Sequence, residues 1–305
     1  MKGIILMSAR YAQAYPHDRY DVFFKQLSKD TGFPFIYTDQ PEVPKDTDVV
    51  IVGFQRTYTN SMMNLAILNK NIKMIGILGD IHSLGNMPGN DIKMLDRYDI
   101  ILGFNEVFFK NLYPKYIDKY AFFPQFFAPV KRYTSLPINK NPIMKCLLIG
   151  NLNPEWMYPF RNWISKKRNP AEIDVLSYPG TFLKKMKTKK TKKYFINDEY
   201  AQKMNSYFCN LVTSGYCMNV MAKFLEAPAS GTLMIGEVCP DLAAMGLLAN
   251  KHYIPITKQD VFLKVSQCLK DPLKYEEIRK NGTDFVRKYH SVENRLKTLK
   301  ELIYE

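Results

Sequence analysis

Lysine and glutamate stand three residues apart in Lys223-Phe-Leu-Glu226-Ala-Pro-Ala-Ser-Gly-Thr, a stretch of small residues that leads into an apolar run. On a helix, that spacing places both side chains on one face. The Glu226 carboxylate can accept hydrogen bonds from two neighbouring sugar hydroxyls, and the Lys223 ammonium can neutralise a phosphate. The segment therefore indicates a site for a phosphorylated sugar, although a surface ion pair before a helix-ending glycine has the same spacing.

A second pair of polar residues follows an apolar run in the first half of the chain. Asp80 and His82 come directly after residues 73–78, and alternate residues of an extended loop point to the same side. A carboxylate in that position can take the proton of an attacking hydroxyl, while His82 assists or holds a sugar. The alternative is that Asp80 caps a helix and His82 is a hydrogen-bonded polar residue of the fold.

Parallel sheets are the elements that would position these residues. Continuous apolar runs such as Asp48–Phe54 are typical of strands buried on both faces, and here they alternate with helix-length segments such as Asp18–Thr31, Ser61–Lys70 and Met218–Ala227. The pattern predicts an α/β fold in which ligands lie at the carboxyl ends of the strands. The expected strands are Gly3–Ser8, Phe33–Thr38, Asp48–Phe54, Lys73–Leu78, Asp99–Gly103, Lys119–Phe123, Ile143–Gly150, Glu172–Leu176, Tyr207–Thr213, Thr232–Ile235 and His252–Ile256.

The proline-containing segment Ala128–Pro142 interrupts this pattern, which then restarts. Such a segment is typical of a linker, so we expect two α/β units of similar size. Gly150 ends the first strand of the second unit, where the missing side chain lets a ligand approach the backbone closely. The last stretch, Ser291–Glu305, is amphipathic and predicts a terminal helix.

The segment around Lys223 resembles the donor-binding motif of group 1 glycosyltransferases, whose pattern is Lys-x-x-Glu-x-x-Ala-x-Gly before an apolar strand. Here these positions are Lys223, Glu226, Ala229 and Gly231. The closing part of the chain is similar to the spore-maturation CgeB-like branch, so that residues 220–305 carry the resemblance. The first half of the chain matches in architecture only.

This resemblance implies the GT-B architecture, in which two Rossmann-like domains with parallel sheets face a central cleft. It implies transfer of a sugar from a nucleotide diphosphate sugar, UDP-linked in our prediction, to a hydroxyl acceptor on a glycan, lipid or glycoconjugate. The nucleotide-sugar is a co-substrate, and no other cofactor is expected. No metal is expected either, because basic groups and helix N-termini can stabilise the leaving diphosphate.

The resemblance also assigns roles to residues. The glutamate at the position of Glu226 is associated with the ribose. Many retaining members carry a second glutamate eight residues earlier, where this chain has Met218, so the sugar contacts and the stereochemical outcome stay open. The residues expected to bind the donor are Gly150, Asn151, Arg161, Tyr216, Lys223, Glu226, Ser230, Gly231 and Thr232.

The remaining expectations concern the domains and the acceptor. Residues 1–138 are expected to form the acceptor domain, residues 139–290 the donor domain, and residues 291–305 a helix that crosses back to the first domain. Asp80 and His82 are the candidate catalytic residues. Arg10, Tyr11 and Arg56 follow N-terminal strands and are expected to contact the acceptor. For Arg161, an ordinary surface position is the alternative.

The net charge is +14, from 43 Lys and Arg against 29 Asp and Glu, which favours anionic partners. Seven lysines lie within the ten residues Lys184–Lys193, either as a solvated loop or as a contact for an anionic surface or DNA. Two alternative functions stay open. The charge would suit a DNA glucosyltransferase that acts on hydroxylated bases. The replacement of a glutamate by Met218 would suit a degenerate protein that only binds nucleotide-sugars.

Cysteine and histidine usage argues against disulfides and zinc. There are 5 cysteines without a Cys-x-x-Cys, and 4 histidines of which none has metal-ligand spacing. No apolar stretch reaches the roughly 20 residues of a membrane span, and the apolar run at the N-terminus is too short for a secretion signal. We therefore expect a cytoplasmic protein, with peripheral attachment to a membrane left open.

Overall fold

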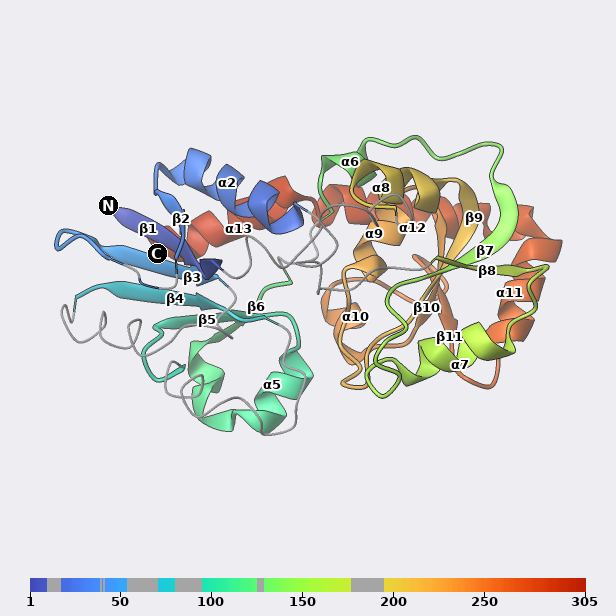
Figure 1. The fold of residues 1–305 in the computed structure, drawn as a ribbon, viewed down its shortest axis with the longest axis horizontal. Coiled ribbons are helices and arrows are strands. Elements are labelled where there is room, and N and C mark those ends of the chain that lie inside the picture. Colours follow the sequence, from blue (N-terminus) through green and yellow to red (C-terminus); the bar gives the residue numbers. More distant parts are fainter. Residues whose placement is uncertain are drawn as a thin grey trace. The chain divides into compact units, whose positions relative to one another are not determined.

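The computed structural model describes residues 1–9, 18–38, 40, 42–53, 71–79, 95–124, 129–176 and 195–305. Contacts divide the chain into two compact units, of which unit 1 is Met1–Pro124 with Leu296–Glu305 and unit 2 is Gln125–Arg295 (Figure 1). Each unit is built on one sheet of parallel strands with helices against it. The predicted α/β fold with two parallel sheets is therefore confirmed.

The sheet of unit 1 has the strand order β2-β1-β3-β4-β5-β6. Ile5 pairs with Ile51, which pairs with Ile75, and all three side chains are fully buried. The continuous apolar runs thus form the centre of the sheet, as expected for strands covered on both faces. The strands are β1 (Gly3–Met7), β2 (Phe35–Tyr37), β3 (Val49–Gly53), β4 (Lys73–Ile77), β5 (Ile100–Gly103) and β6 (Tyr120–Phe122).

The helices of unit 1 include α2 (Arg19–Thr31), α5 (Glu106–Leu112) and most of the terminal helix α13 (Val292–Tyr304). Figure 1 shows α2 and α13 together on one side of the sheet and α5 on the other. Lys300 of α13 forms an ion pair with Asp30 of α2 at 3.2 Å. The Lys73 ammonium of β4 donates to the carbonyl of Leu302 at 3.0 Å, so the end of the chain is bound to this unit.

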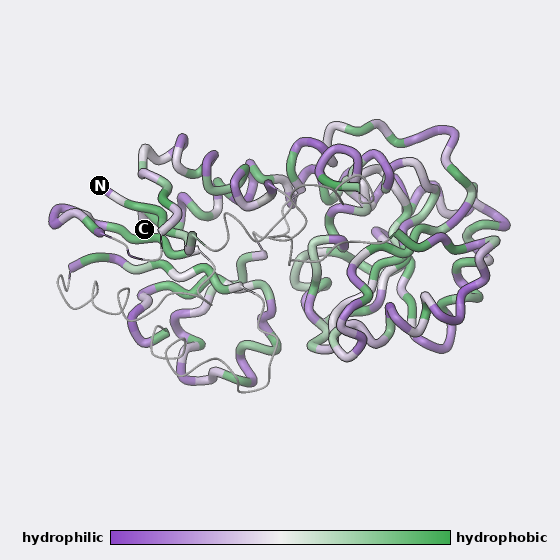
Figure 2. Tube along the Cα trace, viewed as in Figure 1, coloured by the Kyte–Doolittle hydropathy of each residue, from purple (hydrophilic) through white to green (hydrophobic). Residues whose placement is uncertain are grey.

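The sheet of unit 2 has the order β11-β10-β9-β7-β8, again with parallel neighbours. Its strands carry the hydrophobic residues of the unit, and Figure 2 shows hydrophobic colour along the strands with hydrophilic colour on the outer turns. The strands are β7 (Ile143–Ile149), β8 (Ile173–Leu176), β9 (Tyr207–Val212), β10 (Leu233–Glu237) and β11 (Ile254–Ile256).

Helices cover the sheet of unit 2 on both faces (Figure 1). On one face, Trp163 of α7 packs against Phe262 of α11 with ring centroids 5.3 Å apart. On the other face, α9 contacts α6, α8 and α12. The helices are α6 (Lys131–Thr134), α7 (Pro159–Lys167), α8 (Asp198–Asn205), α9 (Lys223–Ala229), α10 (Pro240–Ala244), α11 (Val261–Lys270) and α12 (Glu276–Tyr289).

Helix α9 differs from the expected helix, which began at Met218. The structure has Met218 at a φ of 54°, a left-handed conformation that no helix residue adopts, and α9 begins at Lys223. A non-glycine residue held in this region costs about 1–3 kcal/mol and is typical of functional loops. The predicted helix Ser61–Lys70 lies outside the described residues.

His290 is a buried histidine at the end of α12. Its Nε2 lies 2.9 Å from the carbonyl of Met245, and its Nδ1 is hydrogen-bonded to the Arg295 guanidinium. Because guanidinium only donates, Nδ1 accepts and Nε2–H donates, which is the neutral form. Burial, with a further contribution from the Arg295 and His252 charges, lowers the pKa of His290 from 6.5 to about 3.

Lowering the pH from 7 to 5 is expected to reduce the free energy of unfolding by about 2 kcal/mol through His290 alone. The folded-state pKa lies below the unfolded value near 6.5, so the unfolded chain takes up the proton first. This stability is complete above pH 6.5 and is lost as the pH falls toward 3. Urea unfolding at both pH values tests this, with His290→Gln losing about 2 kcal/mol less than the wild type. Equal losses in both proteins would contradict the prediction.

Candidate functional site

The carboxyl ends of β7 and β9 form the point of unit 2 where the strand order reverses. The chain leaves β7 toward β8 on one side and leaves β9 toward β10 on the other, although β7 and β9 are neighbours in the sheet. Open α/β sheets bind ligands in the crevice outside such a switch point. Gly150 and Thr213 are the first residues after these two strands.

Gly150 lies beneath two basic side chains. Its φ is +116°, and a Cβ built on it would stand 2.6 Å from Nη1 of Arg161 and 2.8 Å from Cε of Lys223. Only glycine accepts both this backbone conformation and such close neighbours. The fold therefore brings together Gly150, Arg161 and Lys223, three of the residues predicted from the sequence to bind the donor.

Arg161 is fully buried, so the alternative of an ordinary surface position is wrong. Its Nη1 donates to the carbonyl of Asn151 at 2.8 Å, while Nε and Nη2 donate to the hydroxyl and carbonyl of Thr213 at 3.0 and 2.6 Å. Its guanidinium also lies 4.6 Å from the Tyr158 ring centroid. Burial lowers the pKa of Arg161 to about 10, so it stays charged at neutral pH. The residue thus joins the loop after β7 to the end of β9.

Lys223 and Glu226 are the first and fourth residues of α9 and share one face of that helix. Lys223 is half-buried, and Glu226 is 1% exposed. A carboxylate is rarely buried to this extent in a protein unless the fold or a ligand supplies it with partners. The burial of Glu226 therefore sets it apart from an ordinary surface ion pair.

Ser230, Gly231 and Thr232 lie at the opposite end of α9 from Lys223. Ser230 and Thr232 are fully buried, and their hydroxyls donate to the carbonyls of Glu226 and Ala227 at 2.7 and 2.9 Å. Gly231 has a φ of +79° and ends the helix, as glycine commonly does. These groups are committed to the fold, and we propose no donor contact for them.

Met218, Asn219 and Tyr216 belong to the loop that leads from β9 into α9. Asn219 is 2% exposed, and its amide nitrogen has no hydrogen-bond partner among the described residues. Tyr216 donates its backbone N–H to the carbonyl of Met157 at 2.9 Å, and the centroid of its ring lies 5.4 Å from that of the exposed Trp156 ring. Neither the buried amide nor the left-handed Met218 has a signature in the sequence, because both depend on the path of the loop.

Glu237 is the last residue of β10 and lies at the carboxyl end of the sheet. Its Oε2 accepts hydrogen bonds from both the backbone N–H and the hydroxyl of Ser214, each at 2.8 Å. The carboxylate thus ties the end of β10 to the loop after β9.

A pocket of about 400 Å³ opens beside Glu237, between α7 and the ends of β10 and β11. Phe160 and Trp163 supply aromatic walls, and the Lys258 ammonium lies 5.2 Å from the Trp163 ring centroid. Aromatic walls with a few polar groups suit a flat heterocyclic ligand. The lining residues are Pro159, Phe160, Trp163, Met218, Glu237, Val238, Ile256, Thr257 and Lys258.

Several predicted residues lie outside the described part of the chain, namely Arg10, Tyr11, Arg56, Asp80, His82 and the run Lys184–Lys193. Within the described ranges, no group of three or more His, Cys, Asp or Glu side chains could hold a metal ion. No helix in these ranges has the length and apolar character needed to cross a membrane.

Comparisons with known proteins identify a family and similar folds. A family model described as glycosyl transferase-like matches residues 142–301, more than half of the chain. The fold is similar to that of Anabaena HepE, solved with UDP and glucose, at 13% identity and a TM-score of 0.62 over 100% of both chains. It is also similar to sucrose-phosphate synthase from Thermosynechococcus elongatus, at 12% identity and a TM-score of 0.66, over 100% of this chain and 98% of that one. A search of curated proteins finds no match.

Proposed function

Because this chain belongs to the glycosyl transferase-like family, we propose that it moves a sugar from a UDP-linked donor to a hydroxyl on a glycan, lipid or glycoconjugate. The observation that carries the proposal is the position of Lys223 beside Gly150 at the switch point of unit 2. A lysine next to a residue without a side chain is suited to a diphosphate, which needs both positive charge and close approach.

The other parts of the donor have candidate positions around this centre. Glu226, one helical turn after Lys223, is proposed to accept hydrogen bonds from the ribose hydroxyls. The pocket walled by Phe160 and Trp163 is proposed to hold the base. UDP is the nucleotide in the similar structure of Anabaena HepE, which supports the choice of uracil.

We further propose that transfer needs no resident metal. The leaving diphosphate requires stabilisation of its growing negative charge, and fixed positive groups in a site that excludes water can supply it. Lys223 would do so by contact, and the buried Arg161 charge would do so from beneath the loop. Arg161 donates to the carbonyl of Asn151, and this hydrogen bond would keep the Asn151 backbone in place beside the diphosphate.

Unit 2 is the proposed donor unit, and unit 1 the proposed acceptor unit. The roles of Asp80 and His82 in catalysis, and of Arg10, Tyr11 and Arg56 in acceptor binding, stay predictions from the sequence. Within the family, residues 220–305 favour the CgeB-like branch.

A thermal-shift screen tests the donor. UDP, ADP, GDP and CDP, each with matching nucleotide-sugars, are compared with uridine, which lacks the diphosphate. A ligand present at about 100 times its Kd stabilises a protein by about 2.7 kcal/mol. We expect UDP and one or more UDP-sugars to raise the unfolding temperature and uridine to have little effect. If no nucleotide stabilises the protein, the proposed function is wrong.

A further inference from the structure

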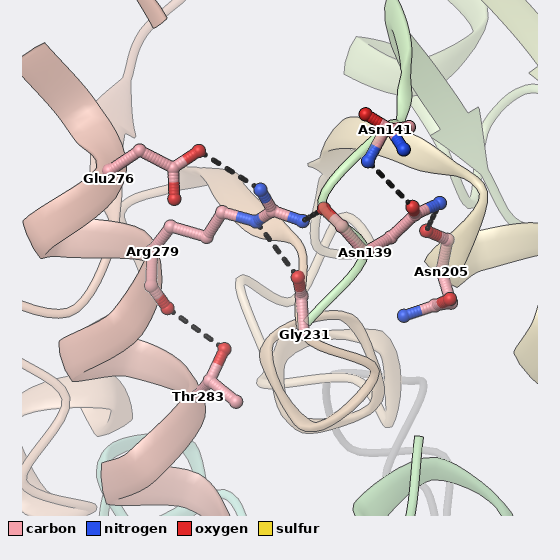
Figure 3. A network of polar contacts seen from close by, with 7 residues as sticks. All are labelled: Asn139, Asn141, Asn205, Gly231, Glu276, Arg279 and Thr283. Carbon is pink, nitrogen blue, oxygen red and sulfur yellow. Dashed lines mark hydrogen bonds and ion pairs between the residues drawn. The ribbon is translucent and has the colours of Figure 1, made fainter. Parts of the chain in front are cut away.

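Arg279 of α12 joins two segments that lie far apart in the sequence. Its Nε donates to the carbonyl of Gly231 at 2.9 Å, and its Nη2 donates to the carbonyl of Asn139 at 3.0 Å. Its Nη1 pairs with Glu276 at 3.0 Å, so that all three nitrogens of the guanidinium are engaged (Figure 3). The Arg279 side chain is 2% exposed, which shields the guanidinium itself from solvent and strengthens its hydrogen bonds.

Arg287, two turns further along α12, makes the same kind of bridge. Its Nε donates to the carbonyl of Ala229 at 2.9 Å, and its Nη2 donates to the carbonyl of Leu136. Both arginines thus connect the C-terminal end of α9 with the segment Leu136–Asn139. We call this pair of bridges the arginine clamp.

Asn205 of α8 fills the gap between the two bridges. Its amide donates to the carbonyl of Ser230 at 2.6 Å and to the carbonyl of Pro137 at 2.8 Å. Gly231 lets the two segments meet, since a Cβ on it would stand 3.1 Å from Cα of Ile138. The last carbonyls of a helix have no partner within it. Here the carbonyl of Ala229, the last residue of α9, and those of the next two residues are each bound by a different side chain.

The clamp acts on a helix that has little stiffness of its own. Helix α9 has 7 residues with Pro228 inside it, about two turns, and so short a helix depends on tertiary contacts for its position. Lys223 and Glu226 lie on the same two turns. A shift or rotation at the clamped end therefore moves both side chains at the other end.

We propose that Arg279 and Arg287 are positioning residues for the donor site: they set the place and rotation of α9, and through it the positions of Lys223 and Glu226. This inference rests on the proposed function, because it assumes that these two residues bind the donor. Displacement of a binding group by about 1 Å is enough to cost on the order of a hundredfold in activity.

The test compares Arg279→Lys and Arg287→Lys by calorimetric titration with UDP. Lysine keeps the charge but lacks the planar fork, so it cannot hold two carbonyls at once. We expect the UDP Kd to rise about tenfold in each variant, with an unchanged number of binding sites per chain. Arg295→Lys is the matched control: that arginine is hydrogen-bonded to His290 rather than to a carbonyl at the end of α9, and its variant should keep the wild-type Kd.

A purely structural role gives a different result. The number of binding sites per chain would then fall as part of the protein fails to fold, while the Kd of the folded remainder stays at the wild-type value. That outcome, or a wild-type Kd and stoichiometry in both variants, overturns the inference.

If both lysine variants fail to fold, Asn205→Ala is the deciding variant, because it removes only the contacts to Pro137 and Ser230 between the two arginine bridges. A raised UDP Kd in this variant supports the clamp, and an unchanged Kd overturns it. A wild-type protein that binds no nucleotide would instead show that the proposed function is wrong.

Discussion

Alanine in place of Gly150 is expected to lower UDP affinity by about a hundredfold or more. The added Cβ would stand 2.6 Å from Nη1 of Arg161 and 2.8 Å from Cε of Lys223, and the φ of +116° is one that alanine rarely adopts. Both basic side chains would have to move, and the backbone proposed to approach the diphosphate would be covered. Calorimetric titration of the folded variant with UDP measures the loss.

Gly246→Ala separates this effect from a general loss of stability. Gly246 also has a positive φ, +78°, and its Cβ would stand 2.7 Å from Cζ of Phe285 rather than against Arg161 or Lys223. We expect both variants to lose roughly 1–3 kcal/mol of stability, since strain and overpacking act in each. Gly246→Ala should keep the wild-type UDP Kd. Wild-type affinity in folded Gly150→Ala would show that the donor does not lie against this loop.

Glu226→Gln is expected to weaken UDP binding by about tenfold to a hundredfold and to reduce the preference for ribose hydroxyls. The amide keeps one acceptor oxygen in place of two, and its NH₂ group cannot accept a hydrogen bond from the second hydroxyl. The wild type should therefore bind 2′,3′-dideoxyuridine diphosphate much more weakly than UDP, whereas the variant should show a clearly smaller difference between the two. The ratio of the two Kd values is the measurement, because it reports on the ribose contact rather than on overall affinity.

Because Gln has nearly the same shape as Glu, the Glu226→Gln substitution is not expected to unfold the protein. Glu226 is 1% exposed, and a neutral group of the same shape is easier to bury than a carboxylate. Glu155→Gln serves as the control, since Glu155 is exposed and its partner is the exposed Lys166. It should keep both affinities. A Glu226→Gln variant that prefers UDP over the dideoxy analogue as strongly as the wild type does would contradict the ribose role.

Local information was sufficient for much of the fold. Each expected strand overlaps an observed one, because a strand buried on both faces is a continuous apolar run that can be recognised without its neighbours. Helix bounds were less predictable, and the start of α9 is an example. The helix begins later than expected because the left-handed backbone of Met218 depends on the loop around it rather than on the residue itself.

By itself, the sequence determined the two parallel α/β units and the shared helix face of Lys223 and Glu226, since both follow from spacing within a few residues. Only the tertiary structure decided that Gly150 lies beneath Lys223 and that Arg161 of α7 is buried against the loop after β7 rather than exposed. It also decided that the hydroxyls of Ser230 and Thr232 are bonded to carbonyls of α9. Those facts depend on contacts between segments far apart in the chain, and burial and hydrogen-bond partners exist only once these segments have met.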